Sequence, residues 1–388
     1  MTVRRRRRAA GVALIVIVCY AMATALRVYV RKHYIFLADY VGWEWGEAGE
    51  ATRASAGPTH VFLLFVDHFE PLYDAARVAR WASRYRSLAR GHADASGRAP
   101  QHTWFYPGEQ KSEAILRILS GLTADGLGEV EMHFHHREET PEALRQGLAE
   151  AIADFQRFGF LQTVDGATHF AFIHGNGSLD DSEGPLMCGV RTELRVLREL
   201  GCFGDFTFPT LFHDSQPPFV NSIYAARDDD DAKSYRRRRP LTDLRHGAAD
   251  LMIFQGPLVF APSLNARRLF LDLDDGDIHE AIPASPRRVD RWIRANVHVA
   301  PRPDWLFVKV FAHGVSSEGE MDATVGPTMD QTLSYLERRY NDGNQYVLHY
   351  VTAREAYNLA LAAAEGATGH PRQYRDAYVP RYRSDPRR

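Results

Sequence analysis

The chain has 388 residues, of which 45% are hydrophobic and 25% are charged, and its formal net charge at pH 7 is −2. This composition excludes a mainly disordered or fibrous chain. A net charge so close to zero gives no overall attraction to nucleic acid, and no nucleic-acid-binding motif surrounds the clustered arginines, so we expect no nucleic-acid partner.

The N-terminus has the features of a membrane-inserted segment. Five arginines at residues 4–8 precede an apolar stretch of 18 residues, 9–26, which as a helix would extend over about 27 Å, just enough to cross a hydrocarbon core. Arginines ahead of such a stretch favour a cytoplasmic N-terminus. We therefore expect a signal anchor over residues 1–32 and a periplasmic or cell-surface domain behind it. A cleaved signal peptide is the alternative, because residues 21–25 offer small-residue cleavage patterns.

Residues 33–57 are expected to form a juxtamembrane connector, whose aromatic side chains suit either the membrane interface or packing against the domain. Residues 58–365 alternate strand and helix patterns, residues 225–247 form a charged insertion, and residues 366–388 are polar and basic, which predicts a disordered tail. Strands are expected at residues 60–66, 103–106, 128–133, 168–173, 203–208, 251–260, 305–312 and 346–351, and helices at 72–93, 113–122, 141–158, 189–200, 328–340 and 353–365.

Strands that alternate with helices imply an α/β fold with a parallel sheet and helices outside it. About seven strands without a glycine-rich dinucleotide fingerprint favour a (β/α) barrel over a doubly wound sheet. In a barrel the active residues gather at the carboxyl ends of the strands.

Ionisable side chains directly follow three of the expected strands, at positions Asp67, His68, His133, His135, His136 and His313. Neutral imidazoles with one carboxylate suit a divalent metal ion, zinc above all, with one position left open for water. Because side chains alternate along a strand, His133 and His135 should face one side and His136 the other, so not all three need be ligands.

A fourth polar segment follows the strand at residues 168–173. His174, Asn176 and Asp180 could line a sugar site, because hydroxyl-rich ligands need paired donors and acceptors. The alternative is a polar turn with side-chain capping.

These segments resemble the polysaccharide deacetylases of the NodB-homology type, carbohydrate esterase family 4, over residues 58–365. The resemblance implies a distorted seven-stranded (β/α) barrel. It also implies that Asp67 is the catalytic base, that His68 takes the metal-binding position beside it, and that His313 is the catalytic acid.

The resemblance further implies that His133, with His136 or His135, forms the pair of metal histidines. The segment at residues 351–355 also looks like the last strand and helix of such domains. The chain departs from the family pattern in three respects: a histidine replaces the second acid, the histidine pair is closer in sequence, and the arginine-bearing proline motif is not recognisable.

The expected function is therefore metal-dependent removal of N- or O-acetyl groups from a cell-envelope polysaccharide. Asp67 would deprotonate the attacking water, and His313 would protonate the leaving group. One alternative is a glycoside hydrolase with Asp67 and Asp180 as its two carboxylates. Another is a non-catalytic polysaccharide-binding or assembly protein on the same barrel.

Two cysteines lie in the globular part of the chain, Cys188 and Cys202. In an oxidising compartment they could form one disulfide. Two buried free thiols are the alternative.

The orientation of the chain in the membrane can be tested directly. A reporter enzyme that is active only after export, fused behind residue 366, should be active, because the arginines at residues 4–8 keep the N-terminus in the cytoplasm. Activity of a cytoplasm-dependent reporter at the same position would contradict the predicted topology.

Overall fold

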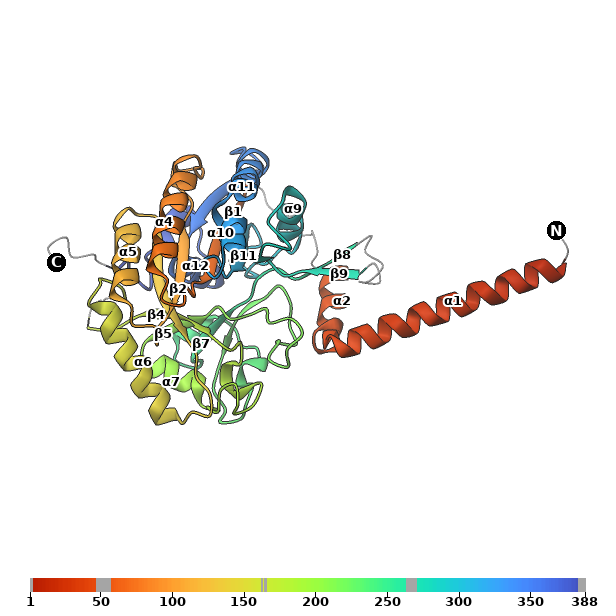
Figure 1. Cartoon of the computed structure of the whole chain (residues 1–388), viewed down its shortest axis with the longest axis horizontal. Coiled ribbons are helices and arrows are strands. Elements are labelled where there is room, and N and C mark those ends of the chain that lie inside the picture. Colours follow the sequence, from red (N-terminus) through yellow and green to blue (C-terminus); the bar gives the residue numbers. More distant parts are fainter. Residues whose placement is uncertain (1–2, 47–56, 162, 164–165, 263–270, 383–388) are drawn as a thin grey trace.

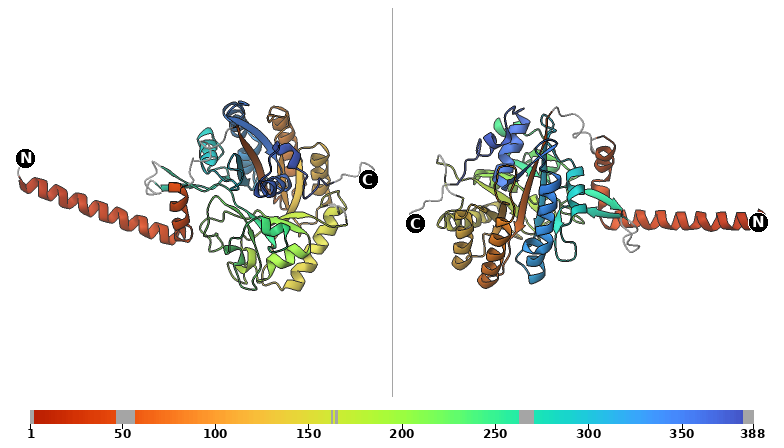
Figure 2. Two further views of the ribbon diagram at one scale, coloured as in Figure 1. Left: turned by 180° about the vertical axis from the view of Figure 1, so that it is seen from behind. Right: turned by 90° about the horizontal axis from the view of Figure 1, so that it is seen from above.

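The computed structural model describes residues 3–46, 57–161, 163, 166–262 and 271–382. Helix α1 projects from an α/β body in which a large curled sheet is flanked by helices (Figures 1 and 2). The helices are α1 (Val3–Val30), α2 (Leu37–Gly46), α4 (Ala75–Arg90), α5 (Glu113–Ala124), α6 (Pro141–Gln156), α7 (Glu193–Glu199), α8 (Thr242–Arg245), α9 (Pro286–Arg294), α10 (Glu318–Val325), α11 (Pro327–Arg339) and α12 (Ala353–Ala364), with short 3₁₀ turns at His33–Ile35, Leu179–Asp181, Ser234–Arg236 and Pro371–Tyr374.

The strands are β1 (Thr59–His68), β2 (His102–Pro107), β3 (Gly128–Phe134), β4 (Phe170–His174), β5 (Cys202–Asp205), β6 (Ile223–Ala226), β7 (Leu251–Phe254), β8 (Val259–Pro262), β9 (Leu271–Asp274), β10 (Asp277–Ile278), β11 (Trp305–Ala312) and β12 (Tyr346–Val351). Ten of them form one sheet in the order β10-β11-β1-β2-β3-β4-β5-β7-β6, with β12 also paired to β1, and β8 pairs with β9 separately. The large sheet is parallel except for the pair β6–β7.

The expected α/β fold with a mostly parallel sheet is confirmed, but the sheet has ten strands, more than the seven of the barrel that the resemblance implies. Strands β6 and β10 were not expected from the sequence, and β10 has only two residues. Within the described residues these two edge strands do not pair with each other. The single strand expected at residues 251–260 is wrong: it is divided into β7 and β8, which belong to different sheets. Pro257 lies between them and has no N–H to donate to a sheet.

Strand β1 lies inside the sheet, third from the edge formed by β10, and shows what each face of the sheet packs against. It pairs with β11 on one side, and on the other with β12 along residues 59–64 and with β2 along residues 65–68. Phe62, Leu64 and Val66 pack in the interior of the curl. The alternate residues of β1 face outward into a second apolar cluster, to which α4, α5 and α6 contribute. Strand β1 is therefore buried on both faces, as is usual in parallel sheets.

Lys309 of β11 crosses the interior of the curl. Its side chain is only 1% exposed, and Nζ donates to the carbonyl oxygens of Phe206 (2.5 Å), Phe208 and Phe254 (3.4 Å). Phe206 and Phe208 follow β5, and Phe254 ends β7. The ammonium group therefore ties β11 to the opposite side of the sheet.

Helix α1 contains an apolar segment, Gly11–Val30, of 20 residues, none of which is buried in the structure. In a helix this segment extends over about 30 Å, enough to cross a membrane. Such a helix fits a signal sequence or a membrane anchor, and its orientation stays a prediction.

The connector packs against the body, which confirms one of the two expectations for it. Phe36, Tyr40 and Trp43 are buried. The Tyr40 hydroxyl accepts a hydrogen bond from the backbone N–H of Phe260, and the Asp39 carboxylate accepts one from the backbone N–H of Val220. The rest of the connector, residues 47–56, lies outside the described residues.

The disordered tail expected from residue 366 onward is not what the described residues show. Arg354 and Asn358 of α12 are buried and donate to the backbone carbonyl of Val379 at 2.7 and 2.8 Å. Tyr382 donates to Glu131 of β3. The segment is held by buried polar groups of α12, which its own polar composition cannot reveal. Residues 383–388 lie outside the described part of the chain.

The role of Lys309 gives a stability prediction. Lys309→Met keeps the length of the side chain but removes its donors, which leaves buried carbonyl oxygens unpaired, so the free energy of unfolding should fall by about 2–3 kcal/mol. Burial lowers the pKa of Lys309 to about 7, against the opposing effect of Asp205 and Asp275, so urea unfolding of the full chain in detergent should be measured at pH 6, where the ammonium is charged.

The matched control is Lys111→Met. Lys111 is about half exposed and pairs only with Glu150 and Asp154 at the surface, so its loss should change the free energy of unfolding by less than about 0.5 kcal/mol. Equal stability of the two variants would contradict the bridging role of Lys309.

Candidate functional site

The curl of the sheet brings together the side chains at the carboxyl ends of β1, β3 and β11. We call this group the mouth cluster: His68, Glu70, His133, His135 and His313. His68 ends β1, His133 lies in β3, and His313 directly follows β11. The convergence of these three histidines was the central expectation from the sequence, and the structure places them together.

Glu70 lies at the centre of the mouth cluster. Its Oε1 is 3.1 Å from Nε2 of His133 and 2.9 Å from Nε2 of His135, and its Oε2 is 3.8 Å from Nε2 of His313. The ring of His68 completes the group, with centroids 5.1 Å from His133 and 4.7 Å from His313. The imidazoles of His133, His135 and His313 thus all direct their Nε2 atoms toward the carboxylate of Glu70.

The charges in the cluster are strongly coupled. Burial opposes ionisation of Glu70, but hydrogen bonds from His133 and His135 outweigh this effect and lower the pKa of the carboxyl group. Burial also opposes protonation of His135, yet its bonds to Glu109 and Glu70 raise its pKa to about 9. Burial, with His313 and His133 nearby, lowers the pKa of His68 well below its ordinary value. Without a metal, a protonated His135 therefore bridges the carboxylates of Glu70 and Glu109, while His68 stays neutral.

The donor set of the mouth cluster fits a divalent metal ion. One ligand atom from each of Glu70, His133 and His135 lies within 4.8 Å of the others, and two imidazoles with one carboxylate form a ligand set typical of catalytic zinc. His133 is fully buried and its Nδ1 has no hydrogen-bond partner, whereas 46% of the His313 side chain is exposed. The cluster is therefore closed on the His133 side and open to solvent on the His313 side.

Asp67, expected to be the catalytic base, is not brought to the mouth cluster. It is fully buried; its Oδ2 lies 2.9 Å from Nε2 of His102, and its Oδ1 accepts the backbone N–H of Gly314 at 2.8 Å. Side-chain alternation along β1 directs His68 into the curl and Asp67 to the outer face. Asp67 thus holds the turn that carries His313, and its role as a base stays a prediction.

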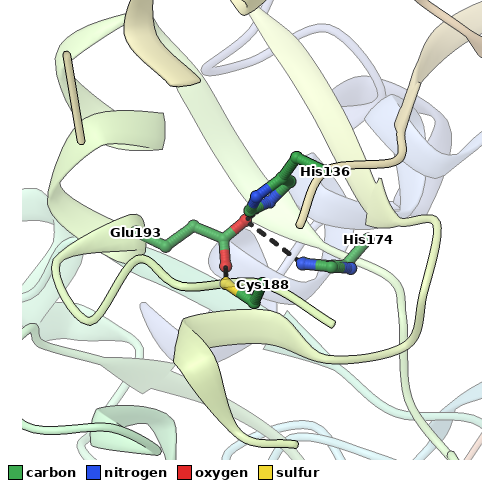
Figure 3. A group of neighbouring side chains, drawn as sticks. All are labelled: His136, His174, Cys188 and Glu193. Atoms are coloured by element: carbon green, nitrogen blue, oxygen red, sulfur yellow. Dashed lines mark hydrogen bonds and ion pairs between the residues drawn. The ribbon is translucent and has the colours of Figure 1, made fainter. Parts of the chain in front are cut away.

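A second group of potential ligands is buried on the outer face of the sheet (Figure 3). His136, His174, Cys188 and Glu193 could hold a metal ion, because one ligand atom from each lies within 4.8 Å of the others. His136 was expected in the same metal site as His133, or to face away from it. The structure places it away, as the alternation of side chains predicts.

The residues expected to line a sugar site lie in the loop behind β4. His174 and Asp180 are fully buried, and Asp180 accepts the backbone N–H of Ser234 at 2.6 Å. The side-chain amide of Asn176 donates to the carbonyl oxygens of His136 and Met187. These groups bond to the protein itself, as in the alternative reading of this segment as a capped polar turn.

Three important residues were missed by the sequence analysis. Glu70 could have been found, because it lies two residues after His68 and should face the same side. Glu193 and Cys188 carry no such signal, because they come from a helix start and a loop that only the tertiary structure brings to the ends of β3 and β4. Cys188 and Cys202 are buried free thiols, the second of the two readings offered for them.

Comparisons of this chain with protein-family models, with curated proteins and with solved structures found no match. What the structure shows is an α/β protein with a large, mostly parallel sheet and two histidine-rich groups near the same strand ends.

Proposed function

We propose that this chain is a metal-dependent hydrolase that removes N- or O-acetyl groups from a cell-envelope polysaccharide, on an unclosed barrel of the deacetylase type. The observation that carries the proposal is the mouth cluster, in which His133, His135 and Glu70 offer two imidazoles and a carboxylate to one ion beside an open face. An ion bound there would polarise the acyl carbonyl of a substrate.

The remaining residues of the cluster supply the proton chemistry. His313 is more exposed than His133 and His135, the other two histidines that face Glu70. Its Nε2 lies 3.8 Å from Oε2 of Glu70, so it can deliver a proton to the departing hydroxyl or amine. Asp67 positions His313 through the backbone N–H of Gly314. His68 is held neutral by burial, so it can accept a hydrogen bond without adding charge.

A carbohydrate substrate is consistent with the surface beside the cluster. Leu72 and Tyr73 follow Glu70 by two and three residues, and both are exposed, Tyr73 by 62%. Both have positive φ values, 49° and 66°, a backbone conformation that costs free energy for such residues and is concentrated at binding sites. The Tyr73 ring offers an apolar face on which a sugar ring can lie.

The two other functions weighed from the sequence have less support. Glycoside hydrolysis would need Asp67 and Asp180 on either side of a bound sugar, but both carboxyl groups are fully buried and accept backbone hydrogen bonds. A polysaccharide-binding or assembly protein without catalysis would not require the mouth cluster to bind a metal ion.

Metal analysis tests the first part of the proposal. The full chain purified in detergent without chelator should contain a divalent ion that His133→Ala removes, lowering the metal content by one equivalent, because a three-ligand site has no ligand to spare. His213→Ala is the matched control, since His213 is exposed and lies outside the cluster. Unchanged content in His133→Ala, before and after titration with zinc, would contradict the site.

Activity tests the second part. Wild-type protein should release acetate from an acetylated polysaccharide, and His313→Ala should keep the mouth metal but lose about 10²–10⁴-fold in turnover, because only the proton donor is removed. Release of reducing sugar in place of acetate would indicate a glycoside hydrolase. Metal binding without release of either product would leave a binding protein as the better reading.

A further inference from the structure

Four polar side chains from four segments meet in the buried group of Figure 3. His136 follows β3, His174 ends β4, Cys188 lies in the loop at residues 175–192, and Glu193 begins α7. All four are buried, and His174, Cys188 and Glu193 are 0% exposed. Burial of a carboxylate, a thiol and two imidazoles away from water is unfavourable unless they are paired or bind a metal.

We propose that His136, His174, Cys188 and Glu193 form a second, structural metal site for zinc or a similar thiophilic divalent ion. This site is distinct from the mouth cluster, and the proposal does not rest on the hydrolase function.

The distances within the group suit a tetrahedral ion. Oε1 of Glu193 lies 3.0 Å from Nε2 of His136 and 3.8 Å from Nε2 of His174, and Oε2 lies 3.5 Å from Sγ of Cys188. Zinc–ligand bonds of about 2.0–2.3 Å in a tetrahedron separate neighbouring ligand atoms by about 3.3–3.7 Å. These three separations lie near this range, and all four ligand atoms lie within 4.8 Å of one another, so an ion can be bound after small side-chain movements.

The charges of the group also suit a divalent ion. With a Cys188 thiolate, a Glu193 carboxylate and two neutral imidazoles, a 2+ ion produces a site with no net charge, as a fully buried position requires. Ion entry would release the Cys188 thiol proton and the proton that His136 shares with Glu193.

The backbone around Cys188 is arranged to support a thiolate. The N–H groups of Asp181 and Val190 point at Sγ from 3.3 and 3.4 Å. In the metal-free protein the thiol instead donates toward Glu193. A sulfur atom with two N–H donors already in place can carry negative charge once an ion binds it.

His174 is neutral but has the wrong tautomer for binding an ion. Its Nδ1 accepts weak hydrogen bonds from the backbone N–H groups of Asn176 and Ser178, at 3.2 and 3.4 Å, so the ring proton lies on Nε2. That nitrogen is buried, directed at Glu193, and has no hydrogen-bond partner. Binding through Nε2 requires its proton to move to Nδ1, which costs the two backbone hydrogen bonds that Nδ1 accepts, so His174 should contribute less affinity than His136 or Cys188.

All four positions around the ion are filled by protein atoms, which is typical of structural and not catalytic sites. The ion would fix the loop at residues 175–192 to the ends of β3 and β4. The ring of His135 lies against Gly175 at the start of that loop, so closely that a Cβ atom there would be 2.4 Å from the ring. By fixing Gly175, the second site would thus also hold the ring of His135 in its position in the mouth cluster.

Cobalt substitution tests this site separately from the mouth cluster. The full chain in detergent, stripped of metal under reducing conditions and titrated with Co²⁺, should develop a thiolate-to-cobalt charge-transfer band in the near ultraviolet. The mouth cluster contains no thiol, so its cobalt cannot produce this band. Absence of the band at saturating Co²⁺ in the wild-type chain would overturn the proposal without the need for any variant.

Variants assign the band to its ligands. Cys188→Ser should abolish it and lower the zinc content by one equivalent, His174→Ala should weaken cobalt binding less than His136→Ala, and His133→Ala should keep the band. Cys202→Ser is the matched control, because Cys202 is also a buried free thiol but lies on β5 outside the group. A band that survives in Cys188→Ser, or disappears in Cys202→Ser, would refute the assignment.

Discussion

The buried ammonium group of Lys309 links two sides of the sheet that are not paired through their backbones in the described part of the chain. A lone charge in an apolar interior is very unfavourable, and here the carbonyl oxygens behind β5 and at the end of β7 supply its hydrogen bonds. The sheet therefore keeps a curl that backbone pairing alone does not close. His313 lies four residues beyond Lys309 on the same segment, so the geometry of the mouth cluster depends on this link.

Within the curl, the alternation of side chains divides one histidine-rich segment between two sites. His133 and His135 face the interior with His68, whereas His136 faces outward with His174. The same alternation separates Asp67 from His68 on β1 and gives the carboxylate a supporting position behind the turn at Gly314. Two groups with different chemistry thus arise from adjacent residues: an open one with a central carboxylate and a closed one with a thiol.

The two proposed metal sites share the carboxyl end of β3, and this suggests that they have different roles. A closed site that fixes the loop at residues 175–192 would position His135, while the open site would act on the substrate. Buried polar groups have a similar supporting role at the other end of the chain, where Arg354 and Asn358 of α12 hold the backbone at Val379. In both places a side chain in the core, and not the local sequence, orders a loop.

The sequence by itself determined the alternation of strands and helices and much of the site. Strands β11 and β12 begin and end where their apolar runs do, because strands buried on both faces show continuous hydrophobic residues. Thr140 caps α6 through its side chain. His68, His133 and His313 converge because parallel strands place their carboxyl ends on one edge. The tertiary structure alone decided that Glu70 is the centre of the mouth cluster, that His136 meets Cys188 and Glu193, and that the segment up to Tyr382 is packed. Those partners come from loops and helix starts, whose position depends on how the whole chain folds and leaves no periodic pattern in the sequence.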